Sequence, residues 1–420
     1  MTMVKASLKQ RVRYVLSHDR QEILLLNLFW LGFLLYTLAW TITSSRQTNF
    51  VVFQSVQIVG ILLMIPTGYK LVKFEFDSHY QKVIFFMIVF WAGIIFLRGL
   101  SFEKEALKLM LLNPWFGGFL YFVPLIMLFP KKLIYYKRMF DVIMVLGVFF
   151  IIYSILFRGD LLETEKNVLS REIVEYFSKT LAVAVSFILM TYFYHSKRRN
   201  LAAFGILALC IFFAIIRARR GLLFMTLGSL FLVFVLFWIN TKYKIVMFLL
   251  SGGVLVLLGS VSVYLVTSSE AEFVSYLQQR GVEDTRTGVE RYFFSDMEGL
   301  DWVIGRGMMG MYYSPTMGQG NYRGTIETDY LNMVLKGGLV QVVLFLLILV
   351  PAIYKGLFQS RNTLSKAAAL WILFWMVNTH PSTVQVFTMN YILVWIGVGI
   401  CYSDTLRNLS EKGLRVYFMI

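Results

Sequence analysis

The stretch LAAFGILALCIFFAIIRARRGLLFMTLGSLFLVFVLFWI, residues 201–239, consists of two long apolar runs with a short basic segment between them. The runs, 201–216 and 221–239, come close to or exceed the length of about 17 residues that a helix needs to cross a bilayer. Only four residues separate the runs, so little chain is left for a loop. This stretch therefore predicts two membrane-spanning helices joined by a tight, strongly basic turn. Three of the four turn residues are arginines: Arg217, Arg219 and Arg220.

The whole chain has the composition of this stretch. Of 420 residues, 58% are hydrophobic and only 15% are charged, whereas about a quarter of a soluble domain is charged. The apolar runs are unbroken, which favours helices over the alternating strands of a β-barrel. We predict an all-α fold, a polytopic membrane bundle of about 12 transmembrane helices. The expected spans are 21–43, 51–69, 82–98, 115–130, 138–157, 179–195, 201–216, 221–239, 244–266, 337–354, 367–380 and 385–403.

The distribution of lysine and arginine predicts how the chain is oriented. If the N-terminus is cytoplasmic, the whole formal net charge of +16 falls on the cytoplasmic side and the outer side is balanced. This explains the basic composition without a nucleic-acid partner. Both termini are then cytoplasmic. The expected organisation is a basic N-terminus (1–20), helices one to nine (21–266), a large extracytoplasmic loop (267–336), helices ten to twelve (337–403) and a cytoplasmic C-terminus (404–420).

The same orientation places the 217–220 turn on the outer side, where positive charge is normally sparse. Arginine kept at such a boundary suggests a functional site, and guanidinium groups bind phosphate oxygens bidentately. The long loop adds further arginines, for which pairing with nearby acids such as Glu290, Asp296 and Asp301 is the alternative explanation. For the arginines of the turn, the alternative is contact with lipid headgroups or structural pairing. Phosphate or diphosphate is thus the expected ligand. The candidate binding residues are Arg217, Arg219, Arg220, Arg291, Arg306 and Arg323.

Three residues near the outer boundary are candidates for acid–base chemistry: Glu327, Asp329 and His380. A carboxylate in a water-poor setting can serve as general base. The alternatives are that the acids only begin a helix, which its dipole favours, and that His380 only caps a helix before Pro381. The glycine-rich segment Gly305–Gly310 suggests either a phosphate cradle or a bend. No His, Asp or Glu cluster has metal-ligand spacing, so we expect neither a metal nor a cofactor.

Three motifs occur in the order and on the side of the membrane typical of one family. They are Arg217-Ala-Arg219-Arg220-Gly221, Trp302-Val-Ile-Gly305-Arg306-Gly307, and Glu327-Thr-Asp329-Tyr330-Leu331-Asn332 followed by Lys336-Gly-Gly-Leu339. In these motifs the C-terminal half resembles the O-antigen polymerase (Wzy-type) and O-antigen ligase superfamily of polytopic membrane glycan transferases.

The resemblance implies a metal-independent glycosyltransferase of the bacterial inner membrane. It implies a polymerase that joins glycan repeats of O-antigen, capsule or exopolysaccharide at the periplasmic face. Its substrate is then an undecaprenyl-diphosphate-linked oligosaccharide, reached among membrane lipids, and whether a chain-length regulator is a further partner stays open. Glu327-Thr-Asp329 stands where the ligase branch has a histidine, which favours the polymerase. Ligase-type transfer and a transporter or flippase of an anionic lipid-linked sugar are the alternatives. The residues expected to contact sugar rings are Tyr312, Tyr313, Tyr322 and Tyr330.

Overall fold

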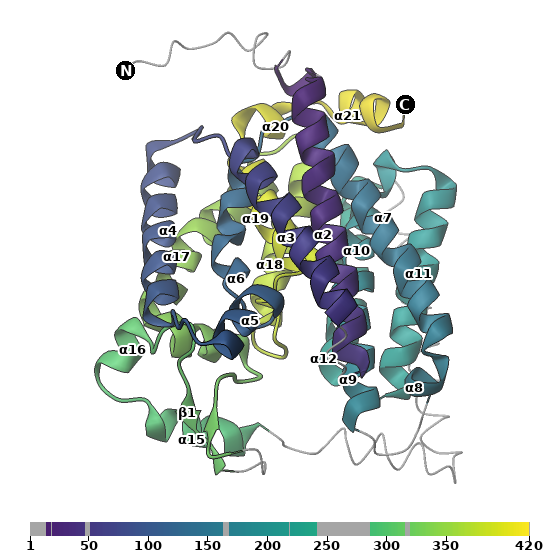
Figure 1. Ribbon diagram of the computed structural model, residues 1–420. Coiled ribbons are helices and arrows are strands. Elements are labelled where there is room, and N and C mark those ends of the chain that lie inside the picture. The colour runs from purple at the N-terminus through teal and green to yellow at the C-terminus, as the bar shows by residue number, and fades with distance from the viewer. Residues whose placement is uncertain are drawn as a thin grey trace.

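The computed structural model describes residues 14–17, 19–46, 51–162, 168–217, 219–241, 286–315 and 320–419. The expected span at 244–266 and the first part of the expected loop, up to residue 285, lie outside the described residues. Among the described residues the regular secondary structure is helical apart from one short hairpin. Both ends of the described chain lie at one end of the bundle, and a small domain lies at the opposite end (Figure 1).

The first half of the chain alternates long helices with short ones. The long helices are α2 (Arg20–Arg46), α3 (Val51–Leu71), α4 (His79–Arg98), α7 (Leu133–Leu156), α11 (Lys197–Ile216) and α12 (Arg220–Asn240). The short elements are α5 (Lys104–Leu112), α6 (Phe119–Phe122), the 3-10 helix η1 (Val123–Leu128), α8 (Arg158–Leu162), α9 (Val168–Phe177), the π-helix η2 (Ser178–Ala182), α10 (Val185–Met190) and the 3-10 helix η3 (Tyr192–Tyr194).

The second half builds the small domain and then returns to the bundle. The domain contains α15 (Thr287–Asp296), α16 (Leu300–Ile304), β1 (Tyr312–Tyr313) and β2 (Tyr322–Arg323). The two strands are antiparallel, with Tyr312 opposite Arg323. The chain then forms α17 (Asp329–Phe358), α18 (Thr363–Asn378), α19 (Met389–Tyr402), α20 (Asp404–Asn408) and α21 (Glu411–Met419).

Side-chain caps mark where several helices begin. The hydroxyl of Ser78 accepts from the amide of Gln81 at the start of α4, and that of Ser196 accepts from Arg199 at the start of α11. Asn362 does the same for Ser365 in α18. These caps satisfy amides that the helix itself leaves without an acceptor.

Within the described residues, eight helical stretches are long and apolar enough to cross a membrane. They confirm the expected class, an all-α, membrane-embedded bundle. The twelve predicted spans are not all reached, because 115–130, 367–380 and 385–403 correspond to shorter apolar helices. In the first of these, Pro124 lies in a 3-10 turn after the four residues of α6. Proline has no N–H to donate and so interrupts the helical ladder.

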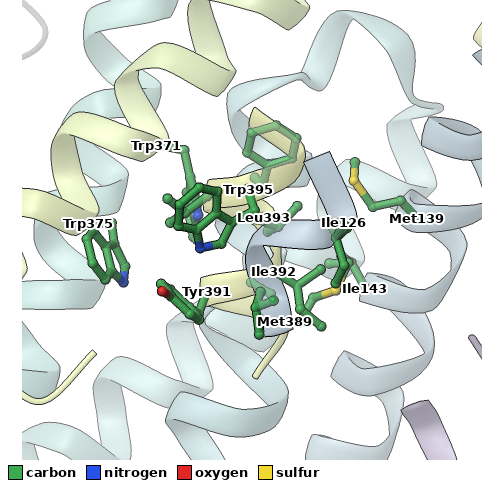
Figure 2. Packing of buried hydrophobic residues seen from close by; sticks show 14 of the residues in the cluster. Ile126, Met139, Ile143, Trp371, Trp375, Met389, Tyr391, Ile392, Leu393 and Trp395 are labelled. Carbon is green, nitrogen blue, oxygen red and sulfur yellow. The ribbon is translucent and has the colours of Figure 1, made fainter. Parts of the chain in front are cut away.

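Close packing of helices depends on small residues and aromatic rings. A Cβ on Gly32 of α2 would lie 2.6 Å from the carbonyl oxygen of Gly60 on α3, so glycine at this crossing allows the backbones to touch. Around α18 and α19 the core is aromatic (Figure 2), and the rings of Trp375 and Tyr391 stack with centroids 5.3 Å apart. These contacts hold the helices that carry the candidate site.

Helix α17 begins earlier than the sequence suggests and is broken near its start. Asp329–Lys336, which we had expected in the long loop, forms its first two turns. At Gly338 the backbone has φ 68° and ψ −176°, which interrupts the helix. Glycine tolerates this positive φ because it has no Cβ. The turns before the break are buried under the small domain, whose core consists of Phe293, Met297, Tyr312, Ile326, Leu331, Val334 and Leu335.

Candidate functional site

Charged side chains from several elements contact the segment between α18 and α19, residues 379–388. The buried carboxylate of Asp329 accepts backbone hydrogen bonds from Val384 at 2.9 Å and Gln385 at 2.5 Å. The amide of Asp329 in turn donates to the carbonyl of Thr379 at 2.8 Å, and its other carboxylate oxygen accepts from Asn332 at 3.4 Å. Asp329 therefore fastens this segment to the first turn of α17.

Arg286, just before α15, reaches the same segment from the small domain. Its guanidinium donates to the carbonyls of His380 at 3.4 Å and Pro381 at 2.5 Å. It also lies 3.4 Å from the carboxylate of Glu327, whose side chain is 68% exposed. The exposed ring of His380 stacks on Tyr330, with centroids 6.1 Å apart. Arg286 thus links the Glu327 carboxylate to the backbone of His380, and the side chains of both expected acid–base residues are exposed.

A second set of charges approaches from α9, η2 and the α11–α12 turn. Glu175 pairs through one carboxylate oxygen with Lys179 at 2.5 Å and through the other with Arg219 at 3.2 Å. The Lys179 ammonium also donates to the carbonyl of Thr383 at 3.2 Å, which links this set to the 379–388 segment. The turn itself packs on that segment, since a Cβ on Gly221 would lie 3.2 Å from the carbonyl oxygen of Pro381.

The three arginines of the turn differ in exposure. Arg217 is buried, with 3% of its surface exposed, Arg219 is half-buried and Arg220 is exposed. The three expected diphosphate ligands therefore differ in how accessible their side chains are. Of the three, Arg219 is the one that pairs directly with Glu175.

Arg306 has a different environment from the arginines of the turn. Its guanidinium bonds to the carboxylates of Asp296 and Asp301 and to the carbonyls of Met311 and Asp296. Burial alone lowers the pKa of Arg306, but the bonds and charges of the two aspartates outweigh burial and raise that pKa. All three guanidinium nitrogens are thus engaged within the small domain. Arg306 stabilises this domain, and we leave it out of the proposed anion site.

The glycine-rich segment 305–310 docks on the break in α17. The amides of Arg306 and Gly307 donate to the carbonyls of Leu335 and Lys336, and the amide of Met308 donates to Ile95 on α4. The Lys336 ammonium donates to the carbonyl of Gly310 at 2.8 Å. Because these amides already have acceptors, the segment is a packing element and offers no phosphate cradle. Its glycines allow the contact, since a Cβ on Gly305 would lie 2.5 Å from the backbone of Lys336.

The expected glycan-binding tyrosines fall into two groups. Tyr312 is fully buried in the core of the small domain, and burial raises the pKa of its hydroxyl. Tyr313 and Tyr322 are exposed on the hairpin, with ring centroids 5.7 Å apart, and Tyr292 of α15 lies 6.5 Å from Tyr313. This aromatic surface of Tyr292, Tyr313 and Tyr322 can stack on sugar rings. Tyr330 lies apart from it, against His380.

The two remaining loop arginines lie in the small domain. Arg323 is half-buried on β2, where its guanidinium interacts with the hydroxyl of Tyr312. Arg291 is exposed on α15. Glu327 therefore contacts the segment that contains His380, and Arg219 is linked to it through Glu175 and Lys179, while Arg306 and Arg323 contribute to the small domain.

The charged cluster around the 379–388 segment includes three residues that were not among the expected site residues: Glu175, Lys179 and Arg286, the last of which is one of the arginines of the long loop. The spacing of Glu175 and Lys179 by four residues was a usable signal, because such pairs face each other on a helix. For Arg286 there was no comparable signal, since its partners Glu327 and Pro381 are remote in sequence. Within the residues that the structure describes, no group of three or more His, Cys, Asp or Glu side chains is placed to hold a metal.

The fold defines an all-α, membrane-embedded helical bundle with a small domain at the end opposite the termini (Figure 1). Comparisons with models of protein families, with curated proteins and with solved structures find no match.

Proposed function

We propose that the protein is a polysaccharide polymerase that transfers glycan repeats between undecaprenyl-diphosphate-linked substrates at the periplasmic face of a bacterial inner membrane. The observation that carries the proposal lies at the 379–388 segment, which contains His380. Arg286 and Glu327 contact this segment directly, and Arg219 is linked to it through Glu175 and Lys179. Cations beside accessible proton acceptors suit transfer from a diphosphate leaving group to a sugar hydroxyl. The motif resemblance supplies the substrate.

The chemistry needs one proton acceptor and one anion site. The acceptor hydroxyl forms a bond to the anomeric carbon of the donor sugar as the bond from that carbon to the diphosphate oxygen breaks. The hydroxyl proton passes to Glu327 or His380. Negative charge grows on the departing diphosphate, where Arg219 and its neighbours in the turn stabilise it. Asp329 acts as a positioning residue, because both of its carboxylate oxygens accept hydrogen bonds within the protein.

The small domain suits the glycan part of both substrates. Its exposed rings, Tyr313 and Tyr322, can hold sugar residues by stacking. Holding donor and acceptor end to end supplies a large share of the rate enhancement, roughly 7–11 kcal/mol in well-oriented cases. Lipid reaches the site from the bilayer and glycan from the aqueous side.

Single substitution of Arg217, Arg219, Arg220 and Arg291 by lysine tests the proposal in membranes that contain the lipid-linked repeat. Lysine keeps the charge but loses the bidentate fork, so we expect at least one variant of the turn to make shortened glycan. Full-length polymer from all four lysine variants would rule out an arginine clamp. Wild-type membranes that show no glycan elongation would reject the polymerase itself.

The other two functions make different products. A ligase moves finished glycan once onto a new acceptor, so its product is a single conjugate and not a ladder of repeats. A transporter changes the side of the membrane on which the substrate lies and leaves glycan length unchanged. Transporters often place broken helices around the substrate, but the break at Gly338 is filled by the backbone of Val303, which supports catalysis over transport.

A further inference from the structure

Lys179 is a buried cation for which the reaction described above has no use. Its side chain is 5% exposed and lies in η2, a π-helix within an otherwise α-helical stretch. The amide of Val183 donates to the carbonyl of Ser178 across this wider turn, and Asn390 donates to the carbonyl of Lys179 at 2.6 Å. Single π-turns are frequent at functional sites. Here the turn directs Lys179 toward Glu175, Thr383 and the ring of Trp115.

The carboxylate of Glu175 binds two cations, one through each oxygen, and a phosphate group can bind two cations in the same way. One oxygen contacts the ammonium of Lys179 and the other contacts the guanidinium of Arg219. The positive charge of Arg286 also acts on Glu175. A phosphate group offers the same pair of anionic oxygens, with a further oxygen and more charge, and bonds strongly to both kinds of cation.

A cavity beside Lys179 provides a second observation that indicates a ligand. Its walls include Met225, Trp371 and Phe374, and its polar lining includes Asn378 and Asn390. Both asparagines are more than nine-tenths buried, and each amide nitrogen donates to a backbone carbonyl. Among the described residues, neither side-chain oxygen has a hydrogen-bond partner. Buried acceptors of this kind call for hydroxyl groups or ordered water next to the Lys179 ammonium.

We infer that Lys179 and Arg219 form an anion site that the carboxylate of Glu175 occupies until a phosphate of the lipid-linked substrate replaces it. The inference rests on the proposed function and names two residues of its donor site, Lys179 as a ligand and Glu175 as an exchangeable counter-ion. In the absence of substrate, Glu175 keeps the buried lysine compensated, which a buried charge requires. When the diphosphate enters, the cations change partner and Glu175 turns away.

Binding of farnesyl diphosphate to the purified full-length protein in detergent tests this exchange. Glu175→Gln removes the competing charge, so we expect binding about tenfold tighter than in the wild type, in the range of coupling between close charges. Lys179→Gln and Arg219→Gln should each weaken binding by about the same factor. Glu105→Gln, exposed on α5 and in no ion pair among the described residues, is the control and should bind as the wild type does. Equal or weaker binding by Glu175→Gln would overturn the exchange and make Glu175 a positioning residue.

Two further measurements keep the test decisive. Because Glu175→Gln leaves a buried ammonium, its melting temperature is recorded, and the double variant Glu175→Gln/Lys179→Gln removes both charges together. The double variant should bind more weakly than the wild type, and wild-type affinity there would overturn the role of Lys179.

Farnesol should not bind. If inorganic diphosphate binds as tightly as farnesyl diphosphate, the site takes free phosphate and the lipid-linked assignment is wrong.

Glycan elongation is a separate readout and distinguishes the two proposals. If the variants change farnesyl diphosphate affinity as stated while wild-type protein makes no polymer, the anion site stands and the polymerase proposal fails. If polymer forms but affinity for farnesyl diphosphate does not depend on Lys179 or Glu175, the polymerase proposal stands and the anion site fails.

Discussion

The guanidinium of Arg286 lies 3.4 Å from the carboxylate of Glu327, although 41 residues separate them in the chain. This ion pair joins the small domain to the approach of α17, and the same guanidinium bonds to the carbonyl of His380. The pair is partly exposed, so it contributes little to stability, about 0–1 kcal/mol. Arg286 thereby links the Glu327 carboxylate to the backbone of His380.

Glu327 is the first residue to test as general base. We expect Glu327→Gln to lower glycan elongation by about two orders of magnitude or more, the usual contribution of a positioned base. The melting temperature should stay near that of the wild type, because the carboxylate is exposed. Elongation rates with matched protein amounts give the answer, and His380→Asn serves as the parallel variant. Wild-type rates in both would remove these two residues from the mechanism.

Asp329 should behave as a structural group. Asp329→Ala leaves the amides of Val384 and Gln385 without their acceptor, which costs about 1–3 kcal/mol for each buried donor. Asp329→Asn can keep one oxygen on those amides, so it should retain most of the stability and much of the activity. Thermal melting and elongation assays measure both effects. A stable but inactive asparagine variant would instead identify Asp329 as the base.

Gly338 should not tolerate a side chain. Its φ of 68° is unfavourable for other residues, and a Cβ there would lie 2.0 Å from the carbonyl oxygen of Val303. Strain of this kind and overpacking together cost about 2–5 kcal/mol, so Gly338→Ala should lower the melting temperature sharply and expose the small domain to protease. Gly288→Ala is the control, because its Cβ meets no described atom within 4 Å. Equal stability of the two variants would contradict the docking of residues 305–310 on α17.

His195, at the end of the bundle that carries the termini, predicts a pH dependence of stability. Burial lowers the pKa of His195 to about 3, and the charge of Arg199 adds to the effect. The folded protein therefore keeps the ring neutral, while the unfolded chain takes up a proton below pH 6.5. Stability from this residue is complete above pH 6.5 and falls as the pH decreases toward 3, by ~2 kcal/mol between pH 7.5 and 5.

The histidine contribution can be isolated with His195→Gln, which does not titrate in this range. We expect the melting temperature of the wild type to fall more between pH 7.5 and 5 than that of the variant. Parallel pH profiles would show that the ring is solvated or charged in the folded protein. That result would disagree with the contacts of the ring, whose Nε2 lies 3.1 Å from the hydroxyl of Thr191 and whose centroid lies 4.6 Å from that of the Phe140 ring.

Apolar run length was enough to predict most of the bundle, because burying a continuous apolar run in lipid requires a helix. It failed at 115–130, where proline shortens the helices, and at 329–336, where a helix begins before the apolar run and carries Asp329 and Lys336 into the buried part. Hydropathy assigns charged residues to loops, so it cannot predict a charged residue that contacts with the rest of the fold keep in a buried helix.

The sequence predicted the chemistry of the candidate site better than it predicted which residues form the site. Arginine next to a membrane boundary indicated an anion site, and Arg219 lies in the charged cluster. Local sequence also suggested that Arg306 could pair with Asp296 and Asp301, as it does. The contacts of Arg286 with Pro381 and of Lys179 with Thr383 join segments far apart in the chain, and no local pattern predicts contacts of that range.

The most direct measurement is elongation by the purified protein in liposomes that contain undecaprenyl-diphosphate-linked repeats as the sole glycan substrate. The proposed function predicts a ladder of lipid-linked products, each one repeat longer than the last, that is lost when Glu327 and His380 are both replaced. Repeats that stay at their original length under these conditions, with folded wild-type protein, would contradict the proposal that the protein is a polymerase.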